Sequence, residues 1–378
     1  MTQSANLAAL GSNASSTGTL GASSYASATI PNSALSGNPT FRNRIINGNM
    51  MIDQRNAGAS VTPVNDGYML DSWKFNCSQA SKFTAQQSST APAGFSNSML
   101  FTVTSAVTVG STDNFMFSQR VEGFNFADLG WGTADAKAVT LSFWVRSSLT
   151  GTFGGSFQNN AENRSYPFTY TISAANTWEQ KTVTVAGDTS GTWVGATNGV
   201  GLKLWFGLGL GSTYSGTAGA WAGSTYFSAT GATSVVGTNG ATFYITGVQL
   251  ERGSTASSFE YRNYGVELMM CQRYYYKVST AQNFLSVGTT YSTYNVYGPA
   301  NLPVKMRTTP SFSYSDVGHF AIAYGVSGYA CTVLGLNAGA SDFPSVYATQ
   351  AGTSFTSGSC GMIYISNASG WWSWSAEL

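Results

Sequence analysis

The chain has 378 residues and a net charge of +1, and only 9% of its residues are charged, against roughly a quarter in an ordinary globular protein. The absence of a basic stripe excludes the electrostatic footprint of a nucleic-acid-binding protein. No apolar run reaches the roughly eighteen residues of a membrane-spanning helix, which excludes membrane insertion. Aromatic residues make up 14% of the chain, and there are 43 glycines. This composition favours strands and tight turns over long solvated helices.

Residues 1–41 contain no charged residue and consist mainly of Ser, Ala, Gly, Thr and Asn. Such a segment buries too little apolar surface to offset the entropy of ordering it. We therefore expect residues 1–42 to form an extended arm that a partner holds, and the alternative is that the arm lies along its own domain. The N-terminus has no basic stretch followed by an apolar one, so we expect synthesis and folding in the cytoplasm.

Residues 43–262 contain short strand-like runs separated by Gly, Asn and Asp turns. In Val139–Val145 the apolar residues alternate with polar ones, so that one face is buried and the other is solvated. Many short strands with this period predict a β-sandwich of the jelly-roll type. The predicted strands are Arg44–Met50, Met69–Phe75, Ser98–Thr104, Phe115–Val121, Val139–Val145, Phe168–Ser173, Glu179–Val185, Gly201–Leu208 and Thr242–Leu250.

A helical connector is predicted over residues 263–277, because Tyr264, Leu268, Cys271 and Tyr275 fall on one stripe at helical spacing. The stripe packs either on its own sandwich or at an oligomer interface. Residues 278–378 then form a second β-sandwich. Its predicted strands are Tyr291–Tyr297, Ser311–Ser315, Ala321–Val326, Ala330–Leu334, Gly361–Ser366 and a terminal apolar strand, Trp371–Leu378, which we expect in the middle of a sheet.

The fold class predicted is thus all-β, with two jelly-roll-like β-sandwiches joined by a short helix and preceded by an extended N-terminal arm. No repeat with a period of about 20–50 residues is present, which argues against a β-helix or a propeller.

Two passages carry a resemblance to a known family. Phe243–Gly253, followed by Ser257–Arg262, resembles the end of a carbohydrate-binding-module-like jelly roll found in the tail proteins of tailed bacteriophages. Glu267–Lys277 resembles the connector that follows this module in phage tail fibres and receptor-binding proteins.

The remaining landmarks agree with this resemblance. Asn43–Met50 and Asp71–Trp73 resemble the start of such modules, and Pro303–Pro310 and Trp374–Leu378 resemble the β-sandwich tip domain. The resemblance implies a homotrimer in the virion tail, attached by residues 1–42 to a tail or baseplate protein, with its C-terminal domain facing the host.

Catalysis is not expected, because the chain has a single histidine, His319, without a nucleophile-elbow pattern. We interpret it as an exposed loop residue. Two carboxylates would suffice for glycoside hydrolysis, and the chain has 16 acidic residues, so a depolymerase is the least favoured function. No zinc-type spacing occurs, and we expect no cofactor or metal. The alternative is a structural calcium ion bound by the carboxylate oxygens of the loop aspartates Asp66, Asp71 and Asp188.

The four cysteines have no C-x-x-C spacing, and we interpret them as reduced, mostly buried thiols. A disulfide between Cys331 and Cys360 across neighbouring strands is the alternative that the sequence leaves open.

Glycan binding is the favoured positive hypothesis, because aromatic rings stack on the apolar faces of sugars while polar groups bind the hydroxyl rim. Two regions combine large aromatics with polar loops, Gly211–Thr230 and the C-terminal domain. The candidate ligand-binding residues are Tyr214, Trp221, Tyr226, Tyr314, Tyr324, Tyr329, Phe343 and Tyr347. The alternative for each is packing against a neighbouring subunit.

The function predicted is a virion structural protein, a tail fibre that attaches to host-surface polysaccharide through its C-terminal region. The alternative is a capsid decoration, head fibre or collar protein without catalytic activity.

Overall fold

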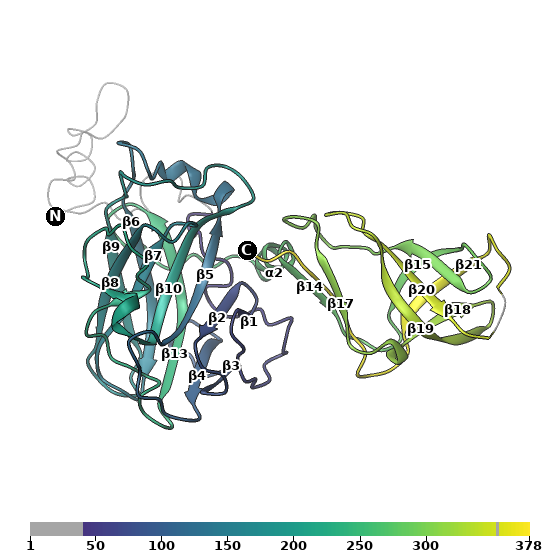
Figure 1. Cartoon of the computed structure of the whole chain (residues 1–378), viewed down its shortest axis with the longest axis horizontal. Helices are drawn as coiled ribbons and strands as arrows, with labels where there is room; N and C mark the ends of the chain where they lie inside the picture. The colour runs from purple at the N-terminus through teal and green to yellow at the C-terminus, as the bar shows by residue number, and fades with distance from the viewer. Residues whose placement is uncertain (1–40, 353–354) are drawn as a thin grey trace, which may run out of the picture. The chain divides into compact units, whose positions relative to one another are not determined.

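The computed structural model describes residues 41–352 and 355–378. The chain divides after Arg42, and residues 43–378 form one unit. Apart from its last two residues, the expected N-terminal arm lies outside the described residues. The regular secondary structure from Asn43 onward is almost entirely β-strand, with one α-helix among the described residues, so the predicted all-β fold class is confirmed (Figure 1).

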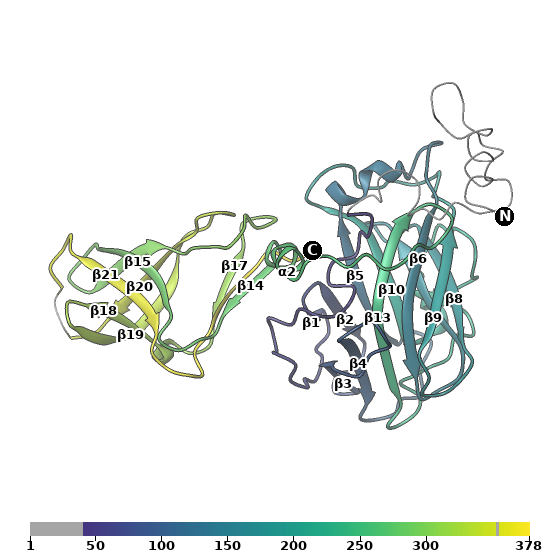
Figure 2. The same cartoon turned by 180° about the vertical axis from the view of Figure 1, so that it is seen from behind.

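Two sheets pack face to face as the sandwich. The first is a six-stranded sheet in the order β1-β2-β5-β10-β7-β8. Its strands are β1 (Gly67–Leu70), β2 (Trp73–Cys77), β5 (Asn114–Glu122), β10 (Val200–Leu210), β7 (Gly151–Gln158) and β8 (Ser165–Ile172). The second has five strands in the order β3-β4-β13-β6-β9. They are β3 (Phe83–Ser88), β4 (Ser98–Val103), β13 (Thr242–Arg252), β6 (Val139–Ser147) and β9 (Glu179–Val185). Figure 2 shows the two sheets from behind.

One predicted strand is two in the structure. Met69–Phe75 was expected to be continuous, but β1 and β2 form a hairpin that turns at Asp71 and Ser72. Ser72 adopts a φ of 66°, in the left-handed region that a strand interior does not use. The hairpin places the Asp71 carboxyl inside the protein, where it is completely buried.

The sandwich core is dominated by aromatic rings. Phe117 lies at its centre, with ring centroids 4.9 Å from Phe101, 5.1 Å from Phe206 and 6.1 Å from Trp73. These residues are 0% exposed and come from strands of both sheets. Alternation therefore predicted the buried face correctly, because every second residue of each strand faces the opposite sheet.

The segment from Asn43 to Met50 is not a strand. Polar side chains satisfy its backbone instead, as the Gln119 side-chain amide donates to the Ile46 carbonyl (2.7 Å) and its oxygen accepts from the Ile46 N–H (2.8 Å). The Asn47 carbonyl accepts from the Trp73 indole N–H (3.1 Å). These bonds explain how an irregular segment can run through a buried environment without orphaned backbone groups.

The predicted connector is shorter than expected. Helix α2 (Tyr264–Gln272) begins after Asn263, whose side chain accepts from the Gly265 N–H. The chain then becomes strand β14 (Tyr275–Val278), so Tyr275 does not continue the helical stripe. Cross-strand pairing of β14 and the β-propensity of consecutive tyrosines override the helical spacing. Cys271 is buried, whereas Tyr264 is 54% exposed.

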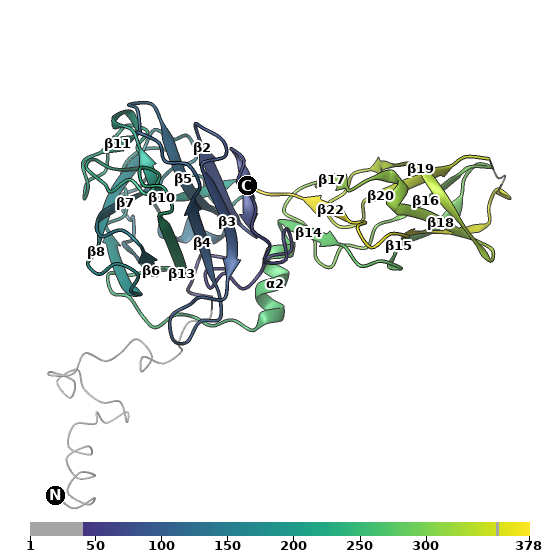
Figure 3. The ribbon, with the colours of Figure 1, turned by 90° about the horizontal axis from the view of Figure 1, so that it is seen from below.

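The C-terminal half contains a three-stranded sheet and a closed six-stranded barrel. The sheet has the order β14-β22-β17, with β17 (Ser311–Tyr314) and β22 (Trp372–Ser375). The terminal tryptophan-rich strand lies in its middle, as expected (Figure 3). The barrel has the order β15-β16-β20-β19-β18-β21. Its strands are β15 (Phe284–Thr290), β16 (Asn295–Pro299), β20 (Ser345–Gln350), β19 (Ser327–Ala338), β18 (Phe320–Tyr324) and β21 (Cys360–Ile365).

Closure distinguishes this half from an open two-layer sandwich, because β21 pairs with both β15 and β18 and leaves the six strands without a free edge.

Candidate functional site

Five residues, one on each of five adjacent barrel strands, form a continuous series of directly opposed pairs. Cys360 pairs with Thr289, and Thr289 with Tyr297. Tyr297 pairs in turn with Tyr347, and Tyr347 with Gly335. Side chains directly opposite in antiparallel strands have Cβ atoms about 4.5–5.5 Å apart and share one face of the sheet. The register therefore brings side chains from distant parts of the sequence into one line.

Tyr297 and Tyr347 point away from the barrel interior, because successive side chains of a strand lie on opposite faces of the sheet. Their neighbours Val296 and Val346 are fully buried, whereas Tyr297 and Tyr347 are half-buried. The two rings have centroids 5.6 Å apart and planes only 23° apart. Tyr291, which is 79% exposed, packs its ring at 66° to that of Tyr297 at 5.4 Å. We name Tyr291, Tyr297 and Tyr347 the tyrosine row.

Gly335 fixes how the last ring of the row lies. A Cβ at this position would be 2.7 Å from Cε1 of Tyr347, 2.9 Å from Cζ and 3.0 Å from the hydroxyl oxygen. The far end of the Tyr347 ring therefore covers the backbone of β19, in space that a side chain would otherwise occupy. The row is thus an aromatic surface laid across three strands.

The chemistry of this surface is neutral. The six described barrel strands contain no Asp, Glu, Lys, Arg or His. Hydroxyl and amide groups border the rings, from Thr289, Thr349 and Asn295. Flat aromatic faces with phenol and alcohol hydroxyls offer stacking and both donor and acceptor hydrogen bonds, which suits an uncharged polyhydroxylated ligand.

Of the predicted C-terminal site residues, only Tyr347 belongs to the tyrosine row. Tyr324 and Tyr329 pack on the buried Phe355, with centroids 4.7 and 5.6 Å away. Tyr314 packs edge-on against Phe320 at 5.9 Å. Phe343, in the connection between β19 and β20, is 71% exposed.

The three predicted residues of the Gly211–Thr230 loop lie in the sandwich. Tyr214 packs on Phe227 at 5.3 Å. The ring of Tyr226 lies against Gly216, where a Cβ would be 2.3 Å from Cδ2. Trp221 contacts Trp131 and Trp193 edge-to-face, at 5.2 and 5.6 Å.

The Trp221 cluster is held by polar contacts within the protein. The Trp221 indole N–H donates to the Ala186 carbonyl (2.9 Å). Beside it, Arg164 makes two bonds to the buried Asp188 carboxylate, at 2.7 and 2.6 Å. These contacts describe a well-packed loop junction, in which ring faces and polar atoms already have protein partners.

The single histidine is half-buried and hydrogen-bonded, not an exposed loop residue as expected. Its Nδ1 lies 2.9 Å from the Ser315 hydroxyl, which also accepts from the Trp371 N–H. Asp316, the adjacent acid, accepts from the Gly318 N–H at 2.8 Å. Among the described contacts none joins a carboxylate to His319, so the pair lacks the orienting acid of a catalytic triad.

The acidic residues beside strand and helix ends are engaged by protein groups. Glu122, which is 2% exposed, receives two bonds from Arg273 (3.0 and 2.6 Å) and one from the Tyr274 hydroxyl. Glu251 accepts from the N–H and hydroxyl of Ser257 (2.8 and 2.6 Å).

The three aspartates considered for calcium do not converge. Asp66 pairs with Lys74 (2.6 Å), Asp188 with Arg164, and Asp71 accepts from the Gln54 N–H and side-chain amide (2.7 and 2.6 Å). Among the described residues, no group of three or more His, Cys, Asp or Glu is placed to hold a metal ion.

The cysteines are all free thiols. This agrees with the interpretation as reduced, mostly buried thiols. The alternative, a Cys331–Cys360 disulfide, is not formed, because β18 lies between β19 and β21 in the barrel. Cys331 is buried and Cys360 is exposed. Burial raises the pKa of the Cys331 thiol to about 12, which keeps it protonated and unreactive.

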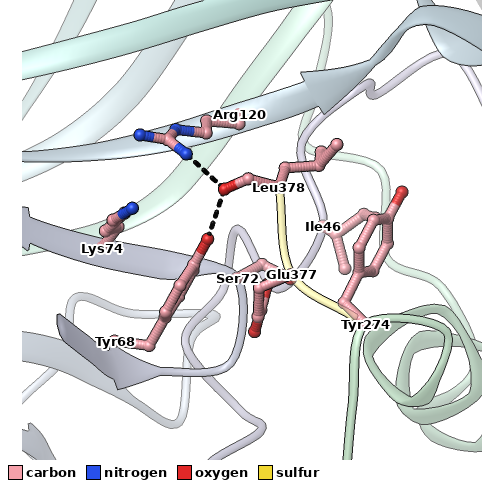
Figure 4. A pocket seen from close by; sticks show the side chains of 8 residues that line it. All are labelled: Ile46, Tyr68, Ser72, Lys74, Arg120, Tyr274, Glu377 and Leu378. Atoms are coloured by element: carbon pink, nitrogen blue, oxygen red, sulfur yellow. Dashed lines mark hydrogen bonds between the residues drawn. The ribbon is translucent and has the colours of Figure 1, made fainter. Parts of the chain in front are cut away.

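A second polar cluster joins the last described residues to the sandwich (Figure 4). The Leu378 carbonyl oxygen accepts from Arg120 and from the Tyr68 hydroxyl (2.8 Å). Glu377 pairs with Arg55, whose guanidinium lies 3.6 Å from the centroid of the Tyr275 ring. We name residues 377–378 with Arg55, Tyr68 and Arg120 the latch. Its polar atoms face one another, so it is a structural junction.

Tyr291 and Tyr297 were not among the predicted site residues. The sequence placed them at the two ends of one predicted strand, but gave no register between that strand and the one that carries Tyr347. No helix of the described chain is long and apolar enough to cross a membrane.

No protein-family model and no curated protein sequence matches the chain. Similar solved structures include the enzymatically active domain of tailspike protein 4 of bacteriophage CBA120, at 15% identity and a TM-score of 0.31 over 56% of this chain. The aligned part is 22% of that tailspike chain.

A putative sugar-binding protein of Bacteroides thetaiotaomicron aligns over 56% of this chain and 100% of its own length, at 12% identity and a TM-score of 0.34. A family 11 carbohydrate-binding module of a Clostridium thermocellum cellulase aligns over 53% of this chain and 99% of its own length, at 10% identity and a TM-score of 0.26. The fold described here rests on the strand pairing and register given above.

Proposed function

We propose that this chain is a non-catalytic glycan-binding protein and that its barrel holds a neutral saccharide on the tyrosine row. The observation that carries the proposal is the in-register pair of outward-pointing tyrosines, Tyr297 and Tyr347, on strands without a single charged residue. The pyranose face of a sugar stacks on the rings of Tyr297 and Tyr347. Tyr291 forms one side of the surface, and the hydroxyls of Thr289 and Thr349 bind the rim.

The direct test measures binding of a neutral-glycan panel to the full chain, on an array and then by isothermal titration calorimetry. The double substitution of Tyr297→Ala and Tyr347→Ala is expected to lower affinity at least about tenfold, which is about 1.4 kcal/mol. Tyr347→Phe separates ring stacking from the hydroxyl, and it should retain most of the affinity. Tyr264→Ala, a change of a 54% exposed tyrosine on α2, is the matched control and should bind as the wild type does.

Two results would contradict this function. One is that the double variant, with an unchanged melting temperature, binds the same glycans equally well. The other is that the row is protected in an oligomer, so that the double substitution changes the oligomeric state and leaves glycan binding intact. Analytical ultracentrifugation of both proteins distinguishes these cases.

We further propose that the protein acts as a tail fibre on a phage virion, as a homotrimer that is attached through residues 1–42 and adheres to host polysaccharide. The family resemblance of residues 43–378 supports this placement, and the barrel surface supplies an adhesive face. Three copies of one weak site on a rigid body raise avidity without any new contact. Synthesis takes place in the cytoplasm of the host.

Cryo-electron microscopy of intact particles tests the placement. Three-fold assemblies on the tail or baseplate with the barrel outward are the expected result. Copies seated on the capsid or collar would replace the tail fibre with a decoration or head-fibre protein. Release of reducing ends from a bound polysaccharide would overturn the non-catalytic assignment.

A further inference from the structure

A second group of aromatic side chains, separate from the tyrosine row, lies on the outward face of the five-stranded sheet of the sandwich. Tyr244 on β13 and Arg146 on β6 lie directly opposite one another. Their neighbours Phe243 and Val145 are 0% exposed, so Tyr244 and Arg146 point away from the core. The ring of Trp178, just before β9, stands at 68° to that of Tyr244, with centroids 6.0 Å apart. The two rings therefore form two adjoining sides of a corner on the sheet surface.

The guanidinium of Arg146 is held over the Tyr244 ring in one orientation. Its carbon lies 5.0 Å from the centroid of the Tyr244 ring, and Nε–H donates to the Asn176 carbonyl at 2.9 Å. Asn176 is itself fixed, because its N–H donates to the Ser147 carbonyl at 2.6 Å. The contacts restrain the side chain from both ends, which lowers the entropy lost when a ligand binds.

The other edge of the guanidinium is open. Among the described residues, the two terminal amino groups of Arg146 make no hydrogen bond to the protein and no ion pair, and they are not buried. The acidic residue of this region, Glu179, is engaged by Lys181 (2.6 Å) and by the N–H groups of Ser173 and Ala174. The positive charge of Arg146 is therefore not neutralised by a carboxylate contact.

This open edge has a specific geometry. The two terminal amino groups of a guanidinium present parallel N–H bonds that match the two oxygens of a carboxylate, and a bidentate pair of this kind is stronger than neutral hydrogen bonds. In a chain with so few charges, an oriented and unpaired arginine beside two aromatic rings combines charge recognition with stacking.

We propose that the corner of Arg146, Tyr244 and Trp178 is a second saccharide site, selective for a sugar that carries a carboxylate. The carboxylate accepts two hydrogen bonds from the terminal amino groups of Arg146. The sugar ring packs against Trp178 and Tyr244. The site is independent of the tyrosine row, which has no charged group and selects neutral sugars.

The test compares acidic and neutral saccharides of equal length and linkage: galacturonate against galactose trimers, and, on an array, glucuronate-, sialate- and pyruvate-containing glycans against their uncharged counterparts. We expect the wild-type chain to bind at least one acidic member tenfold or more tightly than its neutral counterpart at low salt, with the preference falling as salt rises. Arg146→Gln should abolish the preference, and Trp178→Ala should weaken binding of the acidic ligand tenfold.

Arg252→Gln is the matched control, because Arg252 is an exposed arginine on β13 of the same sheet, and it should keep the preference. Three outcomes overturn the proposal. They are equal affinity of every acidic and neutral pair, an unchanged preference in Arg146→Gln, and displacement of the acidic sugar by inorganic sulfate at concentrations equal to those of the sugar carboxylate.

Substitutions at the two sites should have separate effects on saccharide binding. The double substitution of Tyr297 and Tyr347 should leave binding of acidic saccharide unchanged, and Arg146→Gln should leave binding of neutral saccharide unchanged. A variant that loses only neutral-saccharide binding therefore reports on the barrel site. A variant that loses only acidic-saccharide binding reports on the sandwich site.

Discussion

Replacing Asp71 with Asn should change how the stability of the protein depends on pH. The Asp71 carboxyl is completely buried at the β1–β2 turn and accepts from the Gln54 N–H and side-chain amide. Burial raises the pKa of Asp71 to about 7, although Arg55 and the bonds from Gln54 act in the opposite direction. The carboxyl therefore takes up a proton in the folded state under conditions where the unfolded chain has released it.

The sign of the effect follows from this difference. An acid whose folded pKa is raised contributes most to stability below its unfolded pKa, and this contribution is lost as pH rises through the folded pKa. The window runs from 3.8, the ordinary pKa of an aspartate, to about 7. A difference of about 3 pKa units is worth about 4 kcal/mol at 1.36 kcal/mol per unit, and about 3 kcal/mol of it falls between pH 5 and pH 8.

The assay is urea unfolding and differential scanning calorimetry of the full chain at pH 5 and at pH 8. The wild type should lose about 3 kcal/mol over this range, or roughly 6 °C in Tm on the scale of about 2 °C per kcal/mol for large domains. Asp71→Asn carries a neutral amide of the same shape, and it should lose much less. Burial also raises the pKa of Glu377, so a residual slope of the same sign is expected in the variant.

Asp135→Asn, a change of an exposed aspartate, serves as the control and should follow the wild type. The reasoning is refuted if the wild type becomes more stable between pH 5 and pH 8, or if Asp71→Asn shows the same pH dependence as the wild type.

Three substitutions test packing. Gly335→Ala puts a Cβ 2.7 Å from the Tyr347 ring, whose free end can move, so the melting temperature should change by less than about 2 °C while affinity for neutral glycan falls several-fold by calorimetry. Phe117→Ala, at the centre of the sandwich core, should lower the free energy of unfolding by about 3–5 kcal/mol, measured with urea; a loss below about 1 kcal/mol would contradict the packing described. Gly48→Ala would bring a Cβ within 2.1 Å of the Val248 carbonyl oxygen, and because backbone cannot yield as a side chain does, it should cost at least about 2 kcal/mol or prevent soluble expression.

Local periodicity predicted the regular strands well. Val139–Val145 and Glu179–Val185 lie within β6 and β9, because in each case one face packs on the opposite sheet. β7 was missed, since its sequence is glycine-rich, and its pairing with β8 and β10 rather than its own propensity makes it a strand. The connector was predicted too long, because the spacing of Tyr275 cannot show that its backbone pairs with β22, far along the chain.

The candidate site depends on information that a single sequence does not contain. Tyr347 was identified as a large aromatic in a polar region, but its partner Tyr297 is fifty residues away in the chain and adjacent only through the β16–β20 register. The same limit applies to the sandwich corner, where Arg146 and Tyr244 meet through the β6–β13 register. The residue type suggested the chemistry of Tyr347, whereas Arg146 and Tyr244 were not predicted as site residues. In both sites strand pairing determines which side chains meet.

The position of β22 constrains the order in which this protein can be assembled during translation. Among the described strands, β14 and β17 do not pair with each other, and β22 is the hydrogen-bonding partner of both. About sixty residues separate β17 from β22, so both earlier strands leave the ribosome without a partner. A nascent chain arrested before Trp372 should therefore expose Tyr276, Phe312 and Tyr314 to chaperones, and emergence of residues 372–375 should complete the sheet in one step.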